Sequence, residues 1–201
     1  MELGWTLVVP AYLLGTFPTA ILVGRRRGRD VTAEGSGNPG ASNALRTMGR
    51  RAGAAVLLGD LGKGAVAAGV GLLAGRGVGV ACGLAAALGH VAPVTRRFRG
   101  GKGVATAAGM AAVLVPTVAA GLAVLWAVTA KATGTASKAS ITIAVGLPVA
   151  SAVAGRPVPE VAAFAACGAL VVVRHRDNLG RIRRGEEPSL PAGRRRPPAD
   201  R

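Results

Sequence analysis

Six long apolar runs, separated by shorter polar segments, dominate the pattern of this chain. The runs lie at about residues 3–24, 52–75, 77–94, 104–130, 139–155 and 160–173. Most of them approach the roughly 20 apolar residues with which an α-helix crosses a bilayer core about 30 Å thick. The first run is too long for the apolar part of a signal peptide and has no basic residues before it. The pattern predicts an all-α, polytopic integral membrane protein without a soluble domain.

The run at 104–130 is too long for one ordinary span. A single helix over this run would reach about 40 Å at 1.5 Å per residue. Pro116 lies inside the run and disrupts helical hydrogen bonding, so two short helices broken near it are the alternative. One helix here gives six spans in total, and two helices give seven. The two halves are short for a bilayer and are expected to tilt or to thin the lipid around them.

The distribution of basic residues favours seven spans. With the N-terminus outside and the C-terminus in the cytoplasm, 22 of the 25 Lys and Arg residues lie on the cytoplasmic side. Arg76 and Arg156 then lie outside, and Lys63 lies within a span. Cytoplasmic loops of membrane proteins carry such an excess of Lys and Arg. We therefore expect a seven-helix protein of the bacterial cytoplasmic (inner) membrane.

Composition supports this topology and argues against a nucleic-acid-binding or metal-dependent protein. Half of the residues are hydrophobic but only 3% are aromatic, so small side chains fill the spans and allow close helix packing. The net charge of +16 arises from residues in the gaps between apolar runs, and no nucleic-acid partner is expected. Cys82 and Cys167 lie in apolar runs and are expected to be buried thiols. The nine acidic residues form no cluster in the sequence, so no metal is expected.

The first polar motif covers residues 35–46. Its glycines allow backbone amides to approach an anion, its Ser and Asn side chains add neutral donors, and its Arg offers a forked cation for phosphate. The candidate phosphate-binding residues are Ser36, Gly37, Asn38, Gly40, Ser42, Asn43 and Arg46. For such a composition alone, a flexible polar loop is an equally good interpretation.

The second motif is Gly100-Gly101-Lys102-Gly103, which leads into an apolar helix at Val104. Its amides, the helix N-terminus and the mobile ammonium form a reasonable phosphate cradle. The spacing is not that of a Walker A loop. An ordinary basic turn is the simpler interpretation of this motif alone, and His90 before it is expected to be a packing residue.

The remaining polar positions are weaker signals. His175 and Asn178 lie three residues apart, hence on one face if the last span continues as a helix, although a His beside a basic run is usually solvated. Ser137 and Ser140 lie in a hydroxyl-rich turn, where capping the next helix is the simpler role. Asp60 and Lys63 lie inside the second span, so they are expected to pair with each other or with a motif residue.

The topology places all of these polar segments on one side of the membrane. Phosphate-compatible groups would then meet at the interface, next to apolar walls that can hold an acyl chain. A transporter or channel for phosphate or glycerol phosphate is the rival interpretation. Only Asp60 and Lys63 have the mid-membrane position that a carrier needs, and the sequence shows no convincing internal repeat.

Taken together, the motifs resemble those of the PlsY family of acyl-phosphate:glycerol-3-phosphate acyltransferases. The resemblance rests on Ser36–Asn43 with Arg46, on Asp60-x-x-Lys63-Gly64, on Gly89-His90 with Phe98-x-Gly100-Gly101-Lys102-Gly103, and on His175-x-x-Asn178-x-x-Arg181 with Gly185 and Glu187. Ser42 stands where the family often has Thr, and Gly134-Thr135 replaces a common Arg-Tyr pair. The matched segment extends to about residue 187. The Pro/Arg-rich tail at 188–201 lies outside it and is expected to be disordered.

The resemblance implies a seven-helix enzyme that needs no metal or cofactor. It would move a fatty acyl group from acyl phosphate to the sn-1 hydroxyl of glycerol 3-phosphate, giving lysophosphatidic acid and phosphate. A soluble acyl-phosphate synthase would supply the donor. The expected catalytic residues are Ser36, Arg46, Lys102, His175 and Asn178, with Arg46 and Lys102 neutralising phosphate charge. The base is either His175 or a substrate phosphate, and Glu187 is expected to fix the C-terminal segment to a cationic loop.

Overall fold

The computed structural model describes residues 2–190, which form a bundle of α-helices without a β-strand in that range. The all-α prediction is therefore confirmed for these residues. The helices are η1 (Glu2–Leu7), α1 (Val8–Gly15), α2 (Thr19–Arg25), α3 (Ala41–Met48), α4 (Arg50–Leu73), α5 (Arg76–Val91), η2 (Val94–Arg96), α6 (Val104–Leu114), α7 (Pro116–Thr133), α8 (Ala136–Val153), α9 (Val158–Arg174) and α10 (Arg176–Arg183).

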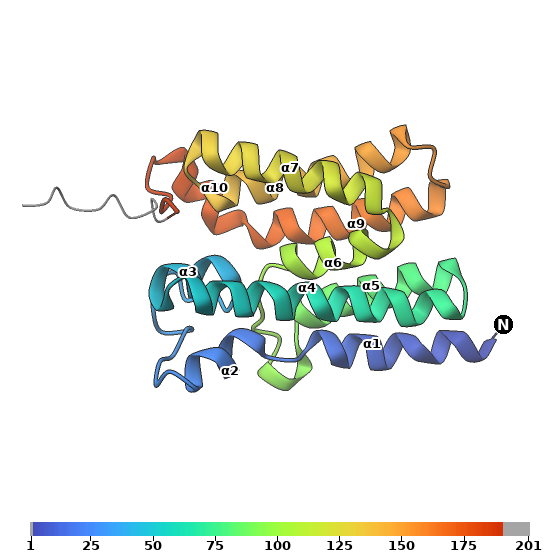
Figure 1. The fold of residues 1–201 in the computed structure, drawn as a ribbon, viewed down its shortest axis with the longest axis horizontal. Helices are drawn as coiled ribbons and strands as arrows, with labels where there is room; N and C mark the ends of the chain where they lie inside the picture. The colour runs from blue at the N-terminus through green and yellow to red at the C-terminus, as the bar shows by residue number, and fades with distance from the viewer. Residues whose placement is uncertain (1, 191–201) are drawn as a thin grey trace, which may run out of the picture.

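The long helices form two groups that are joined through α6. In Figure 1, α1, α4 and α5 lie on one side, α7, α8 and α9 lie on the other, and α6 lies between them. The helix α6 packs against α4, α5 and α7. Its Met110 and Leu114 share a buried cluster with Leu147 of α8 and Phe164 of α9. The two groups are thus held together by one apolar core that is centred on α6.

Small residues allow α4 and α6 to pack at backbone distance. A Cβ atom on Gly64 would lie 2.0 Å from the carbonyl oxygen of Thr106, and one on Gly109 would lie 2.0 Å from that of Leu61. Any larger side chain at either position would push the two helices apart. This contact agrees with the close packing that the aromatic-poor composition predicts.

The first apolar run is interrupted, which the sequence pattern did not indicate. The helix α1 ends at Gly15 and α2 begins at Thr19, with Pro18 in the gap. Proline favours such a break because it has no N–H to donate. The carbonyl of Phe17 accepts a hydrogen bond from the ammonium of Lys63 at 3.0 Å. A buried side chain of α4 therefore satisfies the backbone at this break.

The long run 104–130 is split at Pro116, as predicted. The expectation that both halves are short is wrong, because α7 continues to Thr133, where Gly134 ends it in a left-handed conformation. Of these two helices only α6, with 11 residues, is shorter than the roughly 17–25 residues of an ordinary membrane span. By length and apolar composition, five helical segments can cross a membrane, or six if α9 and α10, which meet at a bend of 55°, count as one span.

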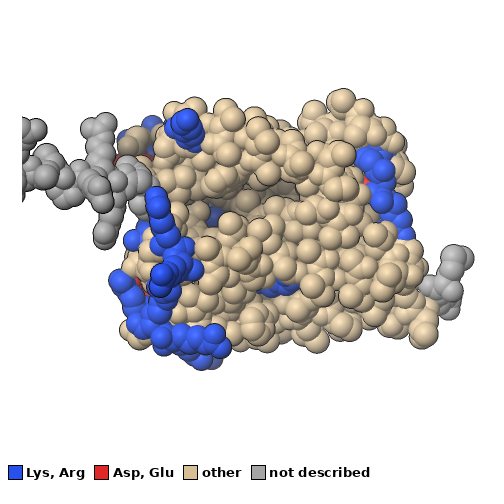
Figure 2. All heavy atoms as spheres, in the orientation of Figure 1, with Lys and Arg blue, Asp and Glu red and all other residues tan. Residues whose placement is uncertain are grey.

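Charged side chains gather at the two ends of the bundle. Figure 2 shows most Lys and Arg at the end that carries α3 and α10, a smaller group at the opposite end, and a nearly uncharged band between them. At the opposite end Glu160 accepts hydrogen bonds from Arg76 (2.7 Å) and Arg156 (3.0 Å). Arg76 also donates to the carbonyl oxygen of Leu114 (2.6 Å), so this ion cluster ties the end of α6 to α5 and α9.

Candidate active site

A cavity of about 670 Å³ runs between α4, α6, α7, α8 and α9, and it opens to the side of the bundle where Figure 2 shows a hollow. One end of the cavity is polar and the rest is apolar. The apolar part is lined mainly by alanines of α6 and α7, together with larger residues of the neighbouring helices such as Leu57, Leu61, Ile143 and Leu147. Because alanine occupies little space, the small side chains of α6 and α7 leave a groove where larger residues would fill the bundle.

Most of the predicted site residues meet at the polar end. Those that line the cavity are Ser36, Asn38, Gly40, Ser42, Asn43, Arg46, Lys102, Gly103, Ser137, Ser140, His175 and Asn178. Gly37, Gly100 and Gly101 do not line it. Four segments that are distant in sequence therefore come together, and they do so beside the apolar groove.

The first motif folds into a turn followed by the short helix α3, which sequence reasoning did not anticipate. Asn43 is buried and shapes the turn: its side chain accepts from the amide of Ser36 (3.0 Å) and donates to the carbonyls of Val31 (2.9 Å) and Glu34 (3.0 Å). With both ends of its amide in use, Asn43 supports the turn more than it offers groups to a ligand.

The start of α3 lies at the cavity. Gly40, Ala41 and Ser42 line it, and no side chain caps this helix end, so its first amides are available to an anion. Arg46, one turn after Ser42, also lines the cavity and approaches the hydroxyl of Ser36 at 3.4 Å. A helix N-terminus, a hydroxyl and a guanidinium thus face the same space.

The second motif is fixed from two sides. The amide of Gly101 donates to the carbonyl of His90 (3.0 Å), and Arg174 donates to the carbonyls of Gly100 (3.1 Å) and Gly101 (3.3 Å). A Cβ atom on Gly100 would lie 2.1 Å from the His90 carbonyl oxygen. These two glycines therefore permit close packing, and the amide of Gly101 is already paired rather than open to phosphate.

Lys102 extends from this fixed segment to the polar end. Its ammonium donates to the side-chain oxygen of Asn178, and Asn178 donates to Glu187 (2.6 Å), which also accepts from Arg181 (2.9 Å). Burial lowers the pKa of Lys102 to about 8, although the charge of Glu187 opposes the shift. Glu187 thus lines the cavity and is held by two residues of α10, instead of joining the C-terminal segment to a cationic loop.

His175 lies at the bend between α9 and α10, and its tautomer follows from one contact. Its Nδ1 atom lies 2.7 Å from the carbonyl oxygen of Val171. A carbonyl can only accept, so Nδ1 carries the proton and Nε2 keeps its lone pair for a molecule in the cavity. Burial lowers the pKa of His175 to about 4, which keeps the ring neutral near pH 7.

A buried ionic cluster lies beside the second motif. The ammonium of Lys63 donates to Asp60 (2.9 Å), to Nδ1 of His90 (2.9 Å) and to the Phe17 carbonyl (3.0 Å), so its three N–H bonds are all used. The expected pairing of Asp60 with Lys63 is confirmed. The side chain of His90 is only 8% exposed and packs against Gly101, as expected of a packing residue, and its carbonyl accepts from the Gly101 amide. The Asp60-x-x-Lys63 spacing was the sequence signal for this cluster.

Removing one charge of this cluster should destabilise the protein strongly. Lys63→Met leaves the Asp60 carboxylate, only 3% exposed, without its cation, and such a loss typically costs about 3–5 kcal/mol. We expect a lower thermal unfolding midpoint for Lys63→Met than for the double variant Asp60→Asn/Lys63→Met, which leaves no buried charge. Equal midpoints for the single and double variants would show that the pair contributes little.

Two further features of the site were missed from the sequence. Trp126 of α7 lines the cavity and donates to the hydroxyl of Ser140 (3.2 Å), and no motif pointed to it. The alanine-lined groove was also not visible in the apolar pattern.

Among residues 2–190 no three His, Cys, Asp or Glu side chains gather as a metal site would require.

Comparison with known proteins gives one consistent result. A family model described as "Glycerol-3-phosphate acyltransferase" matches residues 5–185. The chain is similar to the glycerol-3-phosphate acyltransferases of Rubrobacter xylanophilus (45% identity, 90% of this chain and 92% of that protein) and Bacillus cytotoxicus (40% identity, 94% and 96%). It is also similar to the crystal structure of PlsY (YgiH), an integral membrane glycerol 3-phosphate acyltransferase. The glycerol 3-phosphate form matches with a TM-score of 0.90 at 35% identity, covering 94% of this chain and 96% of that one. The lysophosphatidic acid form matches with a TM-score of 0.87 at 35% identity, covering 92% and 94%.

Proposed function

This chain belongs to the glycerol-3-phosphate acyltransferase family, and on that premise we propose that its acyl donor is an acyl phosphate. The acyl group goes to the sn-1 hydroxyl of glycerol 3-phosphate, and the products are lysophosphatidic acid and inorganic phosphate. The observation that carries the proposal is the single cavity in which a cationic polar end meets an alanine-lined groove. An amphipathic donor with a phosphate head and an apolar chain fits both parts at once.

The polar end has the groups that two phosphorylated substrates require. Arg46 and Lys102 supply positive charge, and Ser36, with the amides at the start of α3, supplies neutral donors. Such fixed donors stabilise the charge that develops on the acyl carbonyl and on the leaving phosphate without a reorganisation step. Asn178, whose side chain already bridges Lys102 and Glu187, is placed to orient glycerol 3-phosphate.

The transfer is direct and needs no acyl-enzyme, because an acyl phosphate is already activated. The hydroxyl oxygen of glycerol 3-phosphate forms a bond to the acyl carbon, and the bond from that carbon to the phosphate oxygen breaks. The hydroxyl proton ends on a phosphate. In this arrangement Nε2 of His175 accepts the hydrogen bond of the hydroxyl and orients it. A pKa of about 4 makes the ring a weak base, which favours this role over full proton abstraction.

The decisive assay uses purified protein with palmitoyl phosphate and glycerol 3-phosphate, and it follows lysophosphatidic acid. Palmitoyl-CoA and palmitoyl-acyl carrier protein serve as alternative donors in parallel reactions. We expect product from the acyl phosphate alone, with glycerol as the inactive acceptor control. Product formation from the thioesters instead would overturn the proposed donor, and uptake of glycerol 3-phosphate into proteoliposomes without acyl transfer would favour the transporter. A soluble enzyme that makes acyl phosphate is the partner this donor requires.

The proposed orientation has seven spans, with α6 as the short one, the N-terminus outside and the polar end of the cavity facing the cytoplasm of a bacterial inner membrane. The excess of Lys and Arg at the end that carries α3 and α10 supports it. Single cysteines should test it in the Cys82→Ala/Cys167→Ala background. A cysteine at position 156 should react with a membrane-impermeant reagent on intact cells, and one at position 99 should react only after lysis. The reverse pattern would invert the orientation.

A further inference from the structure

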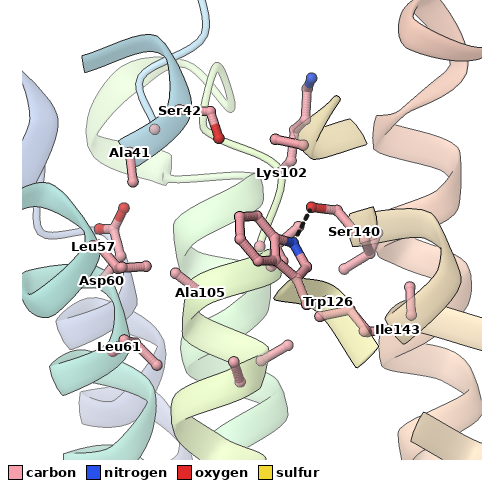
Figure 3. A pocket seen from close by; sticks show the side chains of 18 of the residues that line it. Ala41, Ser42, Leu57, Asp60, Leu61, Lys102, Ala105, Trp126, Ser140 and Ile143 are labelled. Atoms are coloured by element: carbon pink, nitrogen blue, oxygen red, sulfur yellow. Dashed lines mark hydrogen bonds between the residues drawn. The ribbon is translucent and has the colours of Figure 1, made fainter. Parts of the chain in front are cut away.

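Trp126 has an unusual place in this protein. Among the described residues that line the cavity it is the only aromatic one, and the whole chain has few aromatic residues. Figure 3 shows its indole extending from α7 across the cavity toward Ser140 of α8. Its ring N–H donates to the hydroxyl of Ser140 at 3.2 Å, and Ser140 is only 6% exposed. The ring is therefore held inward by a buried partner.

The ring lies at the boundary between the two parts of the cavity. In Figure 3, Lys102 and Ser42 lie on one side of it, and Leu61 and Ile143 lie on the other. Ala105 of α6, which also lines the cavity, is a small residue, so the indole is the bulky group at this level. The indole therefore narrows the cavity between its polar end and its groove.

An anchoring role at the membrane surface is the simplest alternative for a tryptophan in a membrane helix. Interface tryptophans direct the ring N–H toward water or lipid headgroups. Here the N–H is used inside the protein, whereas other apolar side chains of α7, such as Val124 and Val128, are exposed. The hydrogen bond to Ser140 therefore argues for a role inside the cavity.

We propose that Trp126 determines donor specificity by limiting the width of the cavity next to the acyl carbonyl. The inference rests on the proposed donor: with the phosphate near Lys102 and the chain in the groove, the carbonyl and the first chain carbons lie beside the indole. Trp126 then excludes acyl groups that are branched at the carbon next to the carbonyl. It does not limit chain length, since the far part of the groove is lined by other residues.

The test compares palmitoyl phosphate with 2-methylpalmitoyl phosphate, using the full-length protein in detergent. We expect wild type to prefer the unbranched donor in kcat/KM. Trp126→Ala should raise the relative kcat/KM of the branched donor about 10-fold or more, because one methyl group in a tight pocket changes selectivity by about 10- to 200-fold. The KM for glycerol 3-phosphate should change little, since the acceptor binds at the polar end.

Matched variants separate this role from a general loss of structure. Leu125, on the same helix, does not line the cavity. The control variant Leu125→Ala should therefore leave the donor selectivity unchanged. Trp126→Phe keeps an aromatic ring without the N–H and should keep most of the selectivity, and Trp126→Leu should lie between Phe and Ala. Equal losses with both donors, or an unchanged ratio in Trp126→Ala and Trp126→Leu, would overturn the proposal.

An error in the proposed donor and an error in the role of Trp126 give different results. If wild type uses only the thioester, the proposed donor is wrong, and the same comparison is made with palmitoyl-CoA and 2-methylpalmitoyl-CoA. A change of ratio in Trp126→Ala would then still support the role of the indole. An unchanged ratio would reject that role even where the acyl phosphate is the true donor.

Discussion

Arg46→Ala should lower kcat/KM for acyl transfer by about 30-fold to several thousand-fold. Arg46 lines the polar end of the cavity, on the helix whose first amides lie at the same place, and it approaches Ser36. A charged contact to phosphate that is lost from a partly desolvated site costs about 2–5 kcal/mol, and each 1.36 kcal/mol changes a rate tenfold. Initial rates over a range of palmitoyl phosphate and glycerol 3-phosphate concentrations measure the loss.

Two variants show whether the geometry of Arg46 matters or only its charge. Arg46→Lys keeps the charge but not the planar fork that matches phosphate, so it should recover little activity. Arg51→Ala removes a similar charge from an exposed position a few residues away and should leave kcat/KM near wild type. Near-full activity of Arg46→Lys would mean that Arg46 only contributes to the surface charge of this end of the bundle.

His175→Ala should lower kcat by about 100-fold, and His175→Gln should retain a clear part of the lost activity. The Nδ1–H of His175 donates to the Val171 carbonyl, and in the proposed mechanism the free Nε2 accepts the hydrogen bond of the acceptor hydroxyl. A glutamine oxygen can accept a similar hydrogen bond, whereas alanine leaves the hydroxyl unoriented, and misplacement by about 1 Å can cost about 100-fold. An obligatory general base would instead cost about 10²–10⁴-fold, with Gln no better than Ala.

The pH dependence of the rate separates these two roles. The pKa of His175 is lowered to about 4, so the ring is neutral well above that pH and cannot produce a loss of activity near pH 6. Substrate phosphate has a second pKa of about 6, so the acid limb should follow the substrate and persist in His175→Gln. Disappearance of the acid limb together with the imidazole would identify His175 as the base.

The residues that line the polar end of the cavity are positioned by other residues that do not need to touch substrate. Arg174 and His90 both hydrogen-bond to the Gly100–Gly101 backbone. Lys63 contacts His90 and is itself paired with Asp60. The segment that carries Lys102 is therefore placed by contacts from α4, α5 and α9. Catalytic groups that are fixed in this way keep their geometry within the narrow limits that efficient transfer requires.

Local sequence patterns were sufficient for much of the fold. The apolar runs located the long helices, and Pro116 located the break between α6 and α7, because both depend on neighbouring residues. The pairing of Asp60 with Lys63 followed from the three-residue spacing on a helix, together with the large penalty for burying either charge alone. The break at Pro18 was missed although the proline is a local signal for it. What the sequence could not show is that Lys63, 46 residues away, donates to the Phe17 carbonyl at this break.

For the site, too, some features follow from the sequence alone and others only from the tertiary structure. The sequence by itself identified the candidate site residues Arg46, Lys102, His175 and Asn178, since they stand in polar segments whose residue types suit the binding of a phosphorylated substrate. Only the tertiary structure decided what each group can do. It paired the amide of Gly101 with His90, used both ends of the Asn43 amide in a turn, set the tautomer of His175 through Val171, and placed Trp126 across the cavity. These outcomes depend on contacts between distant segments, and hydrogen-bond partners across such distances are set by packing rather than by local sequence.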